Sequence, residues 1–183
     1  MRTEILNIDK GQCLTDVLPA IPANTIFDKT ITGCGATHSE IVNAARNSII
    51  IEPNIPVIIG KEADHPFLFA VYEGITKEDV KAYLAGEHDG YRKIITTPEG
   101  FDKKVLPAMH ELEIPVYKDY FLLFDECEKA IQDVGYRGDI YLPVEDFFKF
   151  ENKAMVSATP IVPSDPRFEE NGFKILKLVP TYD

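Results

Sequence analysis

Residues 120–128 read Tyr-Phe-Leu-Leu-Phe-Asp-Glu-Cys-Glu, an unbroken apolar run that passes directly into acidic side chains. A run of this length is typical of a strand that is buried on both faces of a parallel sheet. In such sheets the ligand site lies at the carboxyl edge of the strands, so Asp125 and Glu126 are expected there. The alternative interpretation is the acidic first turn of a helix, because acids stabilise helix amino termini.

Outward from this strand, the chain alternates short apolar runs with stretches of helical periodicity. Strands are predicted at residues 25–31, 48–52, 67–72, 93–97, 120–125, 154–158 and 173–179, and the last is expected to close the sheet. Helices are predicted at residues 38–47, 76–84 and 99–112, with the last interrupted by Pro107. This alternation indicates an α/β fold with a mainly parallel sheet and helices on both faces.

A glycine-containing loop, Thr30-Ile31-Thr32-Gly33-Cys34-Gly35-Ala36-Thr37, follows the first of these strands and precedes a predicted helix. Glycines let backbone N–H groups curl around phosphates, and a Ser or Thr hydroxyl serves Mg²⁺. The following helix dipole would favour an anion. The phosphate-loop pattern also needs a lysine, and Ala36 stands in that place. A tight turn without a ligand is the alternative.

Five segments of the chain, taken in sequence order, resemble the motifs of superfamily-two, DEAD/DEAH-box-like helicases. TITGCGAT (residues 30–37) resembles motif I, IIIEP (49–53) motif Ia and TTPEGF (96–101) motif Ib. LLFDECE (122–128) resembles motif II, and VSATP (156–160) matches the Ser-Ala-Thr of motif III. The order and approximate spacing of all five carry the resemblance.

The resemblance implies a RecA-like, P-loop NTPase lobe with a three-layer α/β/α sandwich, using ATP and Mg²⁺. It implies that Thr37 and Asp125 serve the metal and that Asp125 and Glu126 are the catalytic carboxylates. Ser157 and Thr159 would bind near the nucleotide and link it to movement against a second lobe. The phosphate loop would consist of Gly33, Cys34, Gly35, Ala36 and Thr37.

Two departures from the family bear on catalysis. The first is that position 36 is Ala36 rather than the phosphate-loop lysine. The site then has three interpretations: an inactive scaffold, weak nucleotide binding through backbone amides, or a lysine supplied from elsewhere, such as Lys29 or Lys61. Loss of such a charge should cost several kcal/mol of transition-state stabilisation, roughly as for other removed donors. Glu128 replaces the usual last residue of motif II, which weakens the expected coupling to motif III.

A helicase also needs a second RecA-like lobe, and residues 1–183 are expected to form only the first, with residues 1–24 as an amino-terminal extension. The chain is therefore expected to be part of a longer protein. DNA or RNA is an expected partner, although 19 basic against 30 acidic residues, a net charge of −11, gives no general attraction to phosphate backbones. The competing hypothesis is a non-catalytic scaffold for nucleic-acid or protein interaction.

Other features set the expected surroundings of the protein. No apolar run is long enough for a membrane span, and three cysteines without framework spacing suggest the reducing cytoplasm. Zinc at Cys34, His38 and Cys127, with Asp125 as the fourth ligand, is an alternative, although the spacing of these residues lacks the usual ligand pairs. The aromatic run at residues 147–150 has acidic neighbours, so it is expected to face the core or the other lobe rather than stack on bases.

Overall fold

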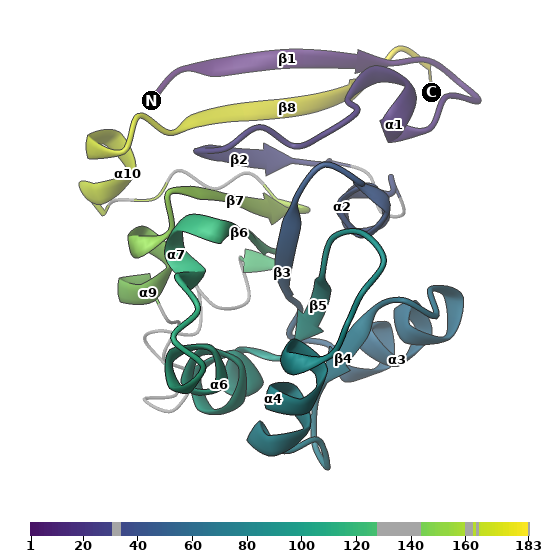
Figure 1. Cartoon of the computed structure of the whole chain (residues 1–183). Coiled ribbons are helices and arrows are strands. Elements are labelled where there is room, and N and C mark those ends of the chain that lie inside the picture. Colours follow the sequence, from purple (N-terminus) through teal and green to yellow (C-terminus); the bar gives the residue numbers. More distant parts are fainter. Residues whose placement is uncertain (31–33, 128–143, 160–162, 164, 183) are drawn as a thin grey trace.

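The computed structural model describes residues 1–30, 34–127, 144–159, 163 and 165–182. Within these residues, eight strands form one sheet, and every strand pair is parallel. Their order across the sheet is β1-β8-β2-β7-β6-β3-β5-β4 (Figure 1). The strands are β1 (Thr3–Ile8), β2 (Thr25–Asp28), β3 (Asn47–Ile51), β4 (Phe69–Val71), β5 (Lys93–Thr96), β6 (Tyr120–Phe124), β7 (Asn152–Ser157) and β8 (Lys174–Pro180). The predicted α/β fold class is confirmed.

Helices cover both faces of this sheet. Figure 1 shows α6, α7, α9 and α10 to the left of the sheet and α1, α2 and α3 to its right. The helices are α1 (Leu14–Val17), α2 (Ala36–Val42), α3 (Ile55–Asp64), α4 (Lys77–Ala85), α5 (Pro98–Gly100), the π-helical turn η1 (Phe101–Val105), α6 (Leu106–Glu111), α7 (Val116–Asp119), α9 (Val144–Lys149) and α10 (Arg167–Glu170). No helix in the described part of the chain combines the length and apolar character needed to cross a bilayer.

Alternating side chains of each strand feed two separate cores. On β3, Ile49 and Ile51 pack with residues of α4, α6 and α9, whereas Ile50 packs with residues of α2 and α3 on the other face. All three isoleucines are fully buried. Successive residues of a strand point to opposite faces, so a strand between two helical layers needs apolar residues at every position. This requirement explains the unbroken apolar runs in the sequence.

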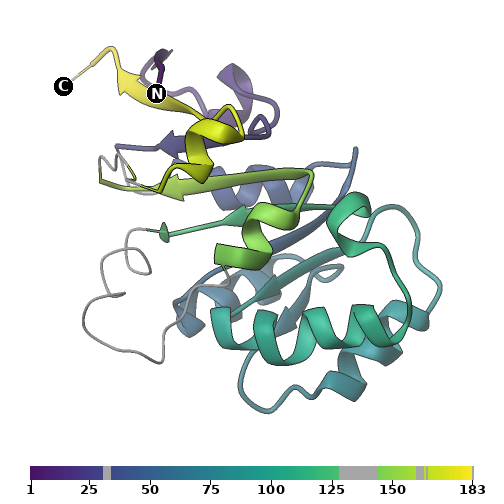
Figure 2. The same ribbon diagram turned by 90° about the vertical axis from the view of Figure 1, so that its left-hand side faces the viewer.

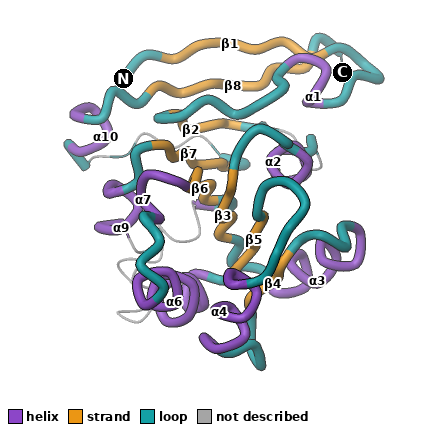
Figure 3. Tube along the Cα trace, viewed as in Figure 1, coloured by secondary structure: helices purple, strands orange, loops and turns teal. Residues whose placement is uncertain are grey.

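The edge of the sheet differs from the prediction. The last strand, β8, was expected to close the sheet, but it lies between β1 and β2. The β1 strand, from the segment predicted as an extension, pairs in parallel with β8 along its whole length (Figure 3). Its burial pattern alternates between exposed and half-buried residues up to the buried Ile8, and Ile5 is 57% exposed. An edge strand with one solvent-exposed face has fewer apolar residues than a buried strand, which explains why β1 was not predicted from the sequence.

The helical segment around Pro107 stays continuous. The chain passes from α5 through η1 into α6, where Pro107 lies in the first turn (Figure 2). The π-helical turn precedes the proline, which cannot donate a backbone hydrogen bond. The predicted interruption is therefore a local change of helical register. Further along the chain, Phe147 and Phe150 are each 1% exposed, so these two rings of the aromatic run lie in the core, whereas Phe148 is half-buried.

Candidate functional site

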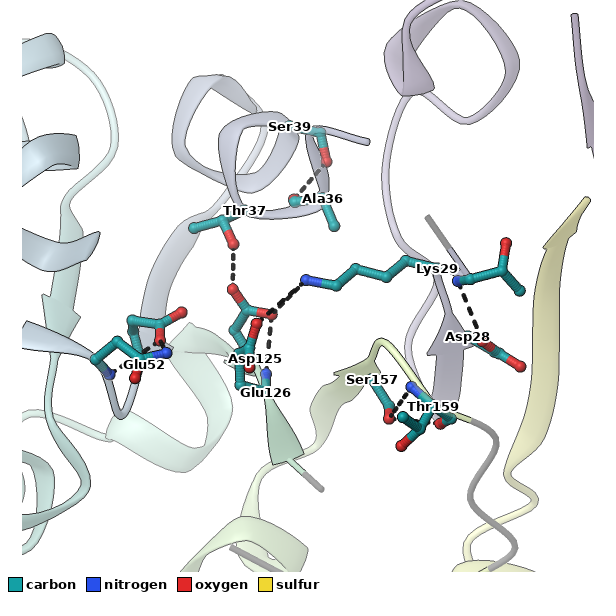
Figure 4. A network of polar contacts seen from close by, with 12 residues as sticks. Asp28, Lys29, Ala36, Thr37, Ser39, Glu52, Asp125, Glu126, Ser157 and Thr159 are labelled. Atoms are coloured by element: carbon teal, nitrogen blue, oxygen red, sulfur yellow. Dashed lines mark hydrogen bonds and ion pairs between the residues drawn. The ribbon is translucent and has the colours of Figure 1, made fainter. Parts of the chain in front are cut away.

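The carboxyl edge of the sheet brings together residues that directly follow three strands. Lys29 follows β2, Glu52 follows β3 and Asp125 follows β6. The backbone N–H groups of Lys29 and Asp125 donate to the carbonyl oxygens of Ser157 and Ile51, with N···O distances of 2.9 Å in both cases. These bonds continue the sheet ladder by one residue, so rigid backbone holds each side chain at the edge (Figure 4).

Asp125 is the centre of this arrangement. Asp125 as a whole residue is only 3% exposed, and its Oδ2 accepts a hydrogen bond from the Thr37 hydroxyl. Its Oδ1 accepts a hydrogen bond from the backbone N–H of Glu126, at 2.9 Å. The structure thus joins the predicted motif I hydroxyl to the first predicted motif II carboxylate, 88 residues apart in sequence.

Thr37 owes its position to the start of α2. Gly35 precedes the helix with φ of +92°, a left-handed conformation that glycine adopts without steric cost. Ala36, the first residue of α2, is 4% exposed and packs in the core beneath this face of the sheet. The helix begins two residues earlier than predicted and ends at Val42 rather than residue 47, where β3 begins. Gly33 lies outside the described residues.

Lys29 is the basic side chain that the structure adds to this centre. Its Nζ lies 3.5 Å from Oε1 of Glu126 and 3.9 Å from Oδ1 of Asp125, and its side chain is 12% exposed. Burial lowers the pKa of Lys29, but the charges of Asp125 and Glu126 together outweigh that effect and hold the pKa above its ordinary value. The ammonium group therefore stays charged beside the two carboxylates.

Glu126 has an unusual backbone conformation, with φ of +55°. Left-handed conformations of residues other than glycine cost on the order of 1 kcal/mol or more and tend to occur at functional sites. Here the conformation turns the chain at the end of β6, where Glu126 faces Lys29. Both acids of the predicted motif II thereby contact the same cation.

Glu52 is a site residue that the sequence analysis quoted in motif Ia without assigning it a role. It is 1% exposed, and its Oε1 accepts bonds from the backbone N–H and side-chain amide of Asn54, at 3.0 and 3.1 Å. Burial, followed by the negative charge and hydrogen bond of neighbouring Asp125, raises the pKa of Glu52 to about 8. Its position directly after a buried strand is the signal that could have identified it.

Ser157 and Thr159 contact each other at the end of β7. The Ser157 hydroxyl donates to the carbonyl oxygen of Thr159 at 2.6 Å and accepts from the Thr159 N–H at 3.1 Å. Figure 4 shows this pair beside the base of Lys29, while the Lys29 side chain extends away toward Asp125. The pair thus closes a local turn next to the Asp125 cluster.

Oxygen donors suited to Mg²⁺ are present at this edge. Mg²⁺ is usually held by one or two carboxylates together with hydroxyls, water and substrate phosphates, and the converging oxygens of Thr37 and Asp125 fit that pattern. Zinc is different: among the described residues, no group of three or more His, Cys, Asp or Glu side chains is arranged to hold a metal ion. Burial raises the pKa of the Cys34 thiol, which disfavours the thiolate that zinc requires.

Comparison with known proteins identifies the fold. No protein-family model and no curated protein matches the chain. Among solved structures, the chain is similar to the Hef helicase domain of Pyrococcus furiosus, with a TM-score of 0.52 and 14% sequence identity. The match covers 88% of this chain and 36% of the Hef chain, so this chain spans about a third of that domain. The chain therefore has a helicase-like, RecA-like α/β fold.

Proposed function

We propose that this chain is the first nucleotide-binding lobe of a DNA or RNA helicase- or translocase-like protein. The observation that carries the proposal is the convergence of the Thr37 hydroxyl and the Lys29 ammonium on the Asp125 carboxylate. These groups come from three different elements and meet at the sheet edge where parallel α/β proteins bind ligands. The fold shared with the Hef helicase domain supports the same assignment.

In this proposal each side chain has a defined task. Mg²⁺ bound with ATP would supply positive charge at the phosphates, and phosphoryl transfer depends chiefly on such charge and on positioning. Thr37 and Asp125 would hold the metal. Glu126 would orient the attacking water. Residues 34–37 would present backbone N–H groups to the phosphates.

Hydrolysis requires more than this lobe. A second RecA-like lobe would close over the nucleotide, and Ser157 and Thr159 would connect the two lobes. The proposal therefore predicts nucleotide binding by this chain alone and hydrolysis only with the second lobe present. Cytoplasmic location belongs to the same proposal and is supported by the three cysteines, whose spacing shows no disulfide framework.

A non-catalytic scaffold is the second candidate, and one observation favours it. Ala36 occupies the place of the phosphate-loop lysine and is buried in the same apolar cluster as Ile41. The position has thus become part of the packing of the lobe. A scaffold of this kind would bind nucleic acid or protein without using nucleotide.

Isothermal titration of the chain with ADP and with ATP, each with and without Mg²⁺, separates the two candidates. The nucleotide-binding lobe predicts micromolar affinity that depends on Mg²⁺ and is weakened in an Asp125→Asn variant. Unfolding curves of the variant provide the control for its fold. Absence of binding at millimolar nucleotide, with the wild-type protein folded, would reject the proposed function and favour the scaffold.

A further inference from the structure

Lys29 has a position that the proposed site needs and that motif I does not provide. It stands seven residues before Ala36, at the start of the loop rather than at its end. A phosphate-loop lysine contributes a positive charge close to the metal and the terminal phosphates. The structure brings the Lys29 Nζ within 3.9 Å of Asp125, the carboxylate that also binds Thr37.

The backbone of Lys29 is held firmly on both sides. Its own N–H bonds to Ser157 of β7, and the hydroxyl of the next residue, Thr30, donates to the carbonyl oxygen of Leu178 in β8 at 2.6 Å. The Thr30 N–H also bonds to the Asp28 carboxylate at 3.2 Å. Because the backbone of Lys29 is fixed by these bonds, only its four-carbon side chain has to become ordered for the ammonium group to reach a ligand.

The stem crosses the end of a neighbouring strand. In the sheet, β7 lies between β2, which precedes Lys29, and β6, which precedes Asp125. Figure 4 shows the Lys29 side chain extended across this gap with its Nζ pointing at the Asp125 and Glu126 carboxylates. With neighbouring strands about 4.8 Å apart, only a long side chain reaches from β2 to β6. Lysine supplies that reach together with a flexible point charge.

From this geometry we infer that Lys29 replaces the missing phosphate-loop lysine and binds the terminal phosphates of a nucleoside di- or triphosphate. The inference rests on the proposed function. The ammonium group pairs with Asp125 and Glu126 at 3.9 and 3.5 Å, distances at which it can exchange these carboxylates for another anion. A divalent cation at Asp125 would neutralise that carboxylate, and the Lys29 ammonium would then turn to the phosphate oxygens.

The test compares phosphate chains of different length. Lys29→Met keeps much of the aliphatic stem and removes the charge, and Lys61→Met is the matched control on α3. Affinities of the wild type and both variants are measured by titration with ADP and AMP in the presence of Mg²⁺. Lys29→Met should weaken ADP binding about 10- to 100-fold, the loss expected for a charged hydrogen bond, and leave AMP binding unchanged. Lys61→Met should match the wild type.

The outcomes distinguish the two levels of the proposal. If the wild type binds ADP and Lys29→Met binds it equally well, the role of Lys29 is wrong while the proposed function stands. If neither the wild type nor Lys61→Met binds ADP, both are wrong. An equal loss for ADP and AMP in Lys29→Met would also overturn the phosphate assignment.

A second measurement does not depend on the variant folding. Acylation of lysine amines in the wild type, read by mass spectrometry, should slow at Lys29 when Mg²⁺ and ADP are added, relative to Lys61. AMP should give no such protection. Unchanged labelling of Lys29 at saturating ADP would contradict the inference.

Discussion

Two buried charged clusters lie at opposite ends of β3, and among the described residues they differ in the balance of acids and cations. At the carboxyl end, three carboxyl groups meet one described ammonium group; these residues are Lys29, Glu52, Asp125 and Glu126. At the amino end, one carboxylate serves two cations; these residues are Glu40, Arg46, Ser48 and Lys93. The α2 helix contributes to both clusters, with Thr37 and Glu40 one turn apart.

Most contacts of the amino-end cluster are short, although the Lys93 Nζ lies 3.9 Å from Oε1 of Glu40. Arg46 binds both oxygens of Glu40 at 2.9 and 2.7 Å, and the Ser48 hydroxyl donates to Glu40 at 2.6 Å. Lys93 donates to Ser48 at 2.9 Å, and Arg46 also lies over the Phe121 ring. A bidentate, fully hydrogen-bonded pair fixes structure. The carboxyl-end ion pairs, at 3.5 and 3.9 Å with acids in excess, leave room for a ligand to exchange them.

Burial of charge therefore does not by itself identify a functional site in this protein. Both clusters are buried, and both contain a lysine or acid whose pKa is strongly displaced. Among the described residues, the carboxyl-end cluster is distinguished by its excess of acids over ammonium groups and by its place at the edge where α/β sheets bind ligands. The following changes test that distinction.

Replacing Glu40 should have the largest effect. Glu40→Ala leaves the charges of Arg46 and Lys93 without their carboxylate, and breaking a buried pair costs about 3–5 kcal/mol of the free energy of unfolding. Urea denaturation measures the loss. The control is Glu99→Ala, which removes an exposed pair with Lys103 and should change stability little. A loss of less than about 1 kcal/mol in the free energy of unfolding of Glu40→Ala would show that the amino-end cluster does not stabilise the fold.

Glu52 should give the protein a pH-dependent stability. Its pKa is raised by burial to about 8 in the folded protein from an ordinary value of 4.5, so the protonated form is favoured by folding. Its stabilising contribution is therefore complete below about pH 4.5 and is lost as the pH rises through about 8. Each pKa unit corresponds to about 1.4 kcal/mol.

The matched variant for this prediction is Glu52→Gln, which keeps the shape of the protonated carboxyl group. Its free energy of unfolding should vary less between pH 5 and pH 9 than that of the wild type, and it should be the more stable protein at pH 9. Thermal or urea unfolding across this pH range, without Mg²⁺, measures the difference. Parallel pH profiles for the two proteins would show that Glu52 does not bind the proton.

A smaller effect is expected at Thr37, on the ligand side of the comparison. Thr37→Val keeps the size of the side chain and removes the hydroxyl, so Mg²⁺-dependent ADP binding should weaken about tenfold. Thr37→Ser retains the hydroxyl and should bind like the wild type. Equal affinity of the Val and Ser variants would mean that the hydroxyl only supports Asp125 structurally.

The smallest effect on nucleotide affinity is expected at Ser157. Ser157→Ala removes the two hydrogen bonds with Thr159 and should lower the free energy of unfolding by about 0.5–1.5 kcal/mol for each. Affinity of this lobe for ADP should not change, because Ser157 acts on the second lobe in the proposed function. A clear loss of affinity would instead place Ser157 among the nucleotide-binding side chains.

Most of the sheet could be predicted from the sequence, because buried parallel strands require unbroken apolar runs. The runs around Ile50 and Leu122 lie in strands within one residue of the predicted bounds. The helix at Thr76 was also predictable, since the Thr76 hydroxyl and the Asp79 carboxylate form a capping box visible in sequence. The end of α2 could not be predicted in the same way, because Asn47 belongs to β3, where it pairs with Tyr120 of β6.

The sequence by itself determined that acids follow a buried strand and that a glycine-containing loop precedes a helix. Both features are local, because they follow from the periodicity of apolar residues and from the residues that come directly after each strand. Only the tertiary structure placed β1 outside β8, buried Glu52 against Asp125 and brought Lys29 across β7 to the same carboxylate. The physical reason is that strand order and the reach of a long side chain depend on contacts between residues distant in sequence, which no local pattern records.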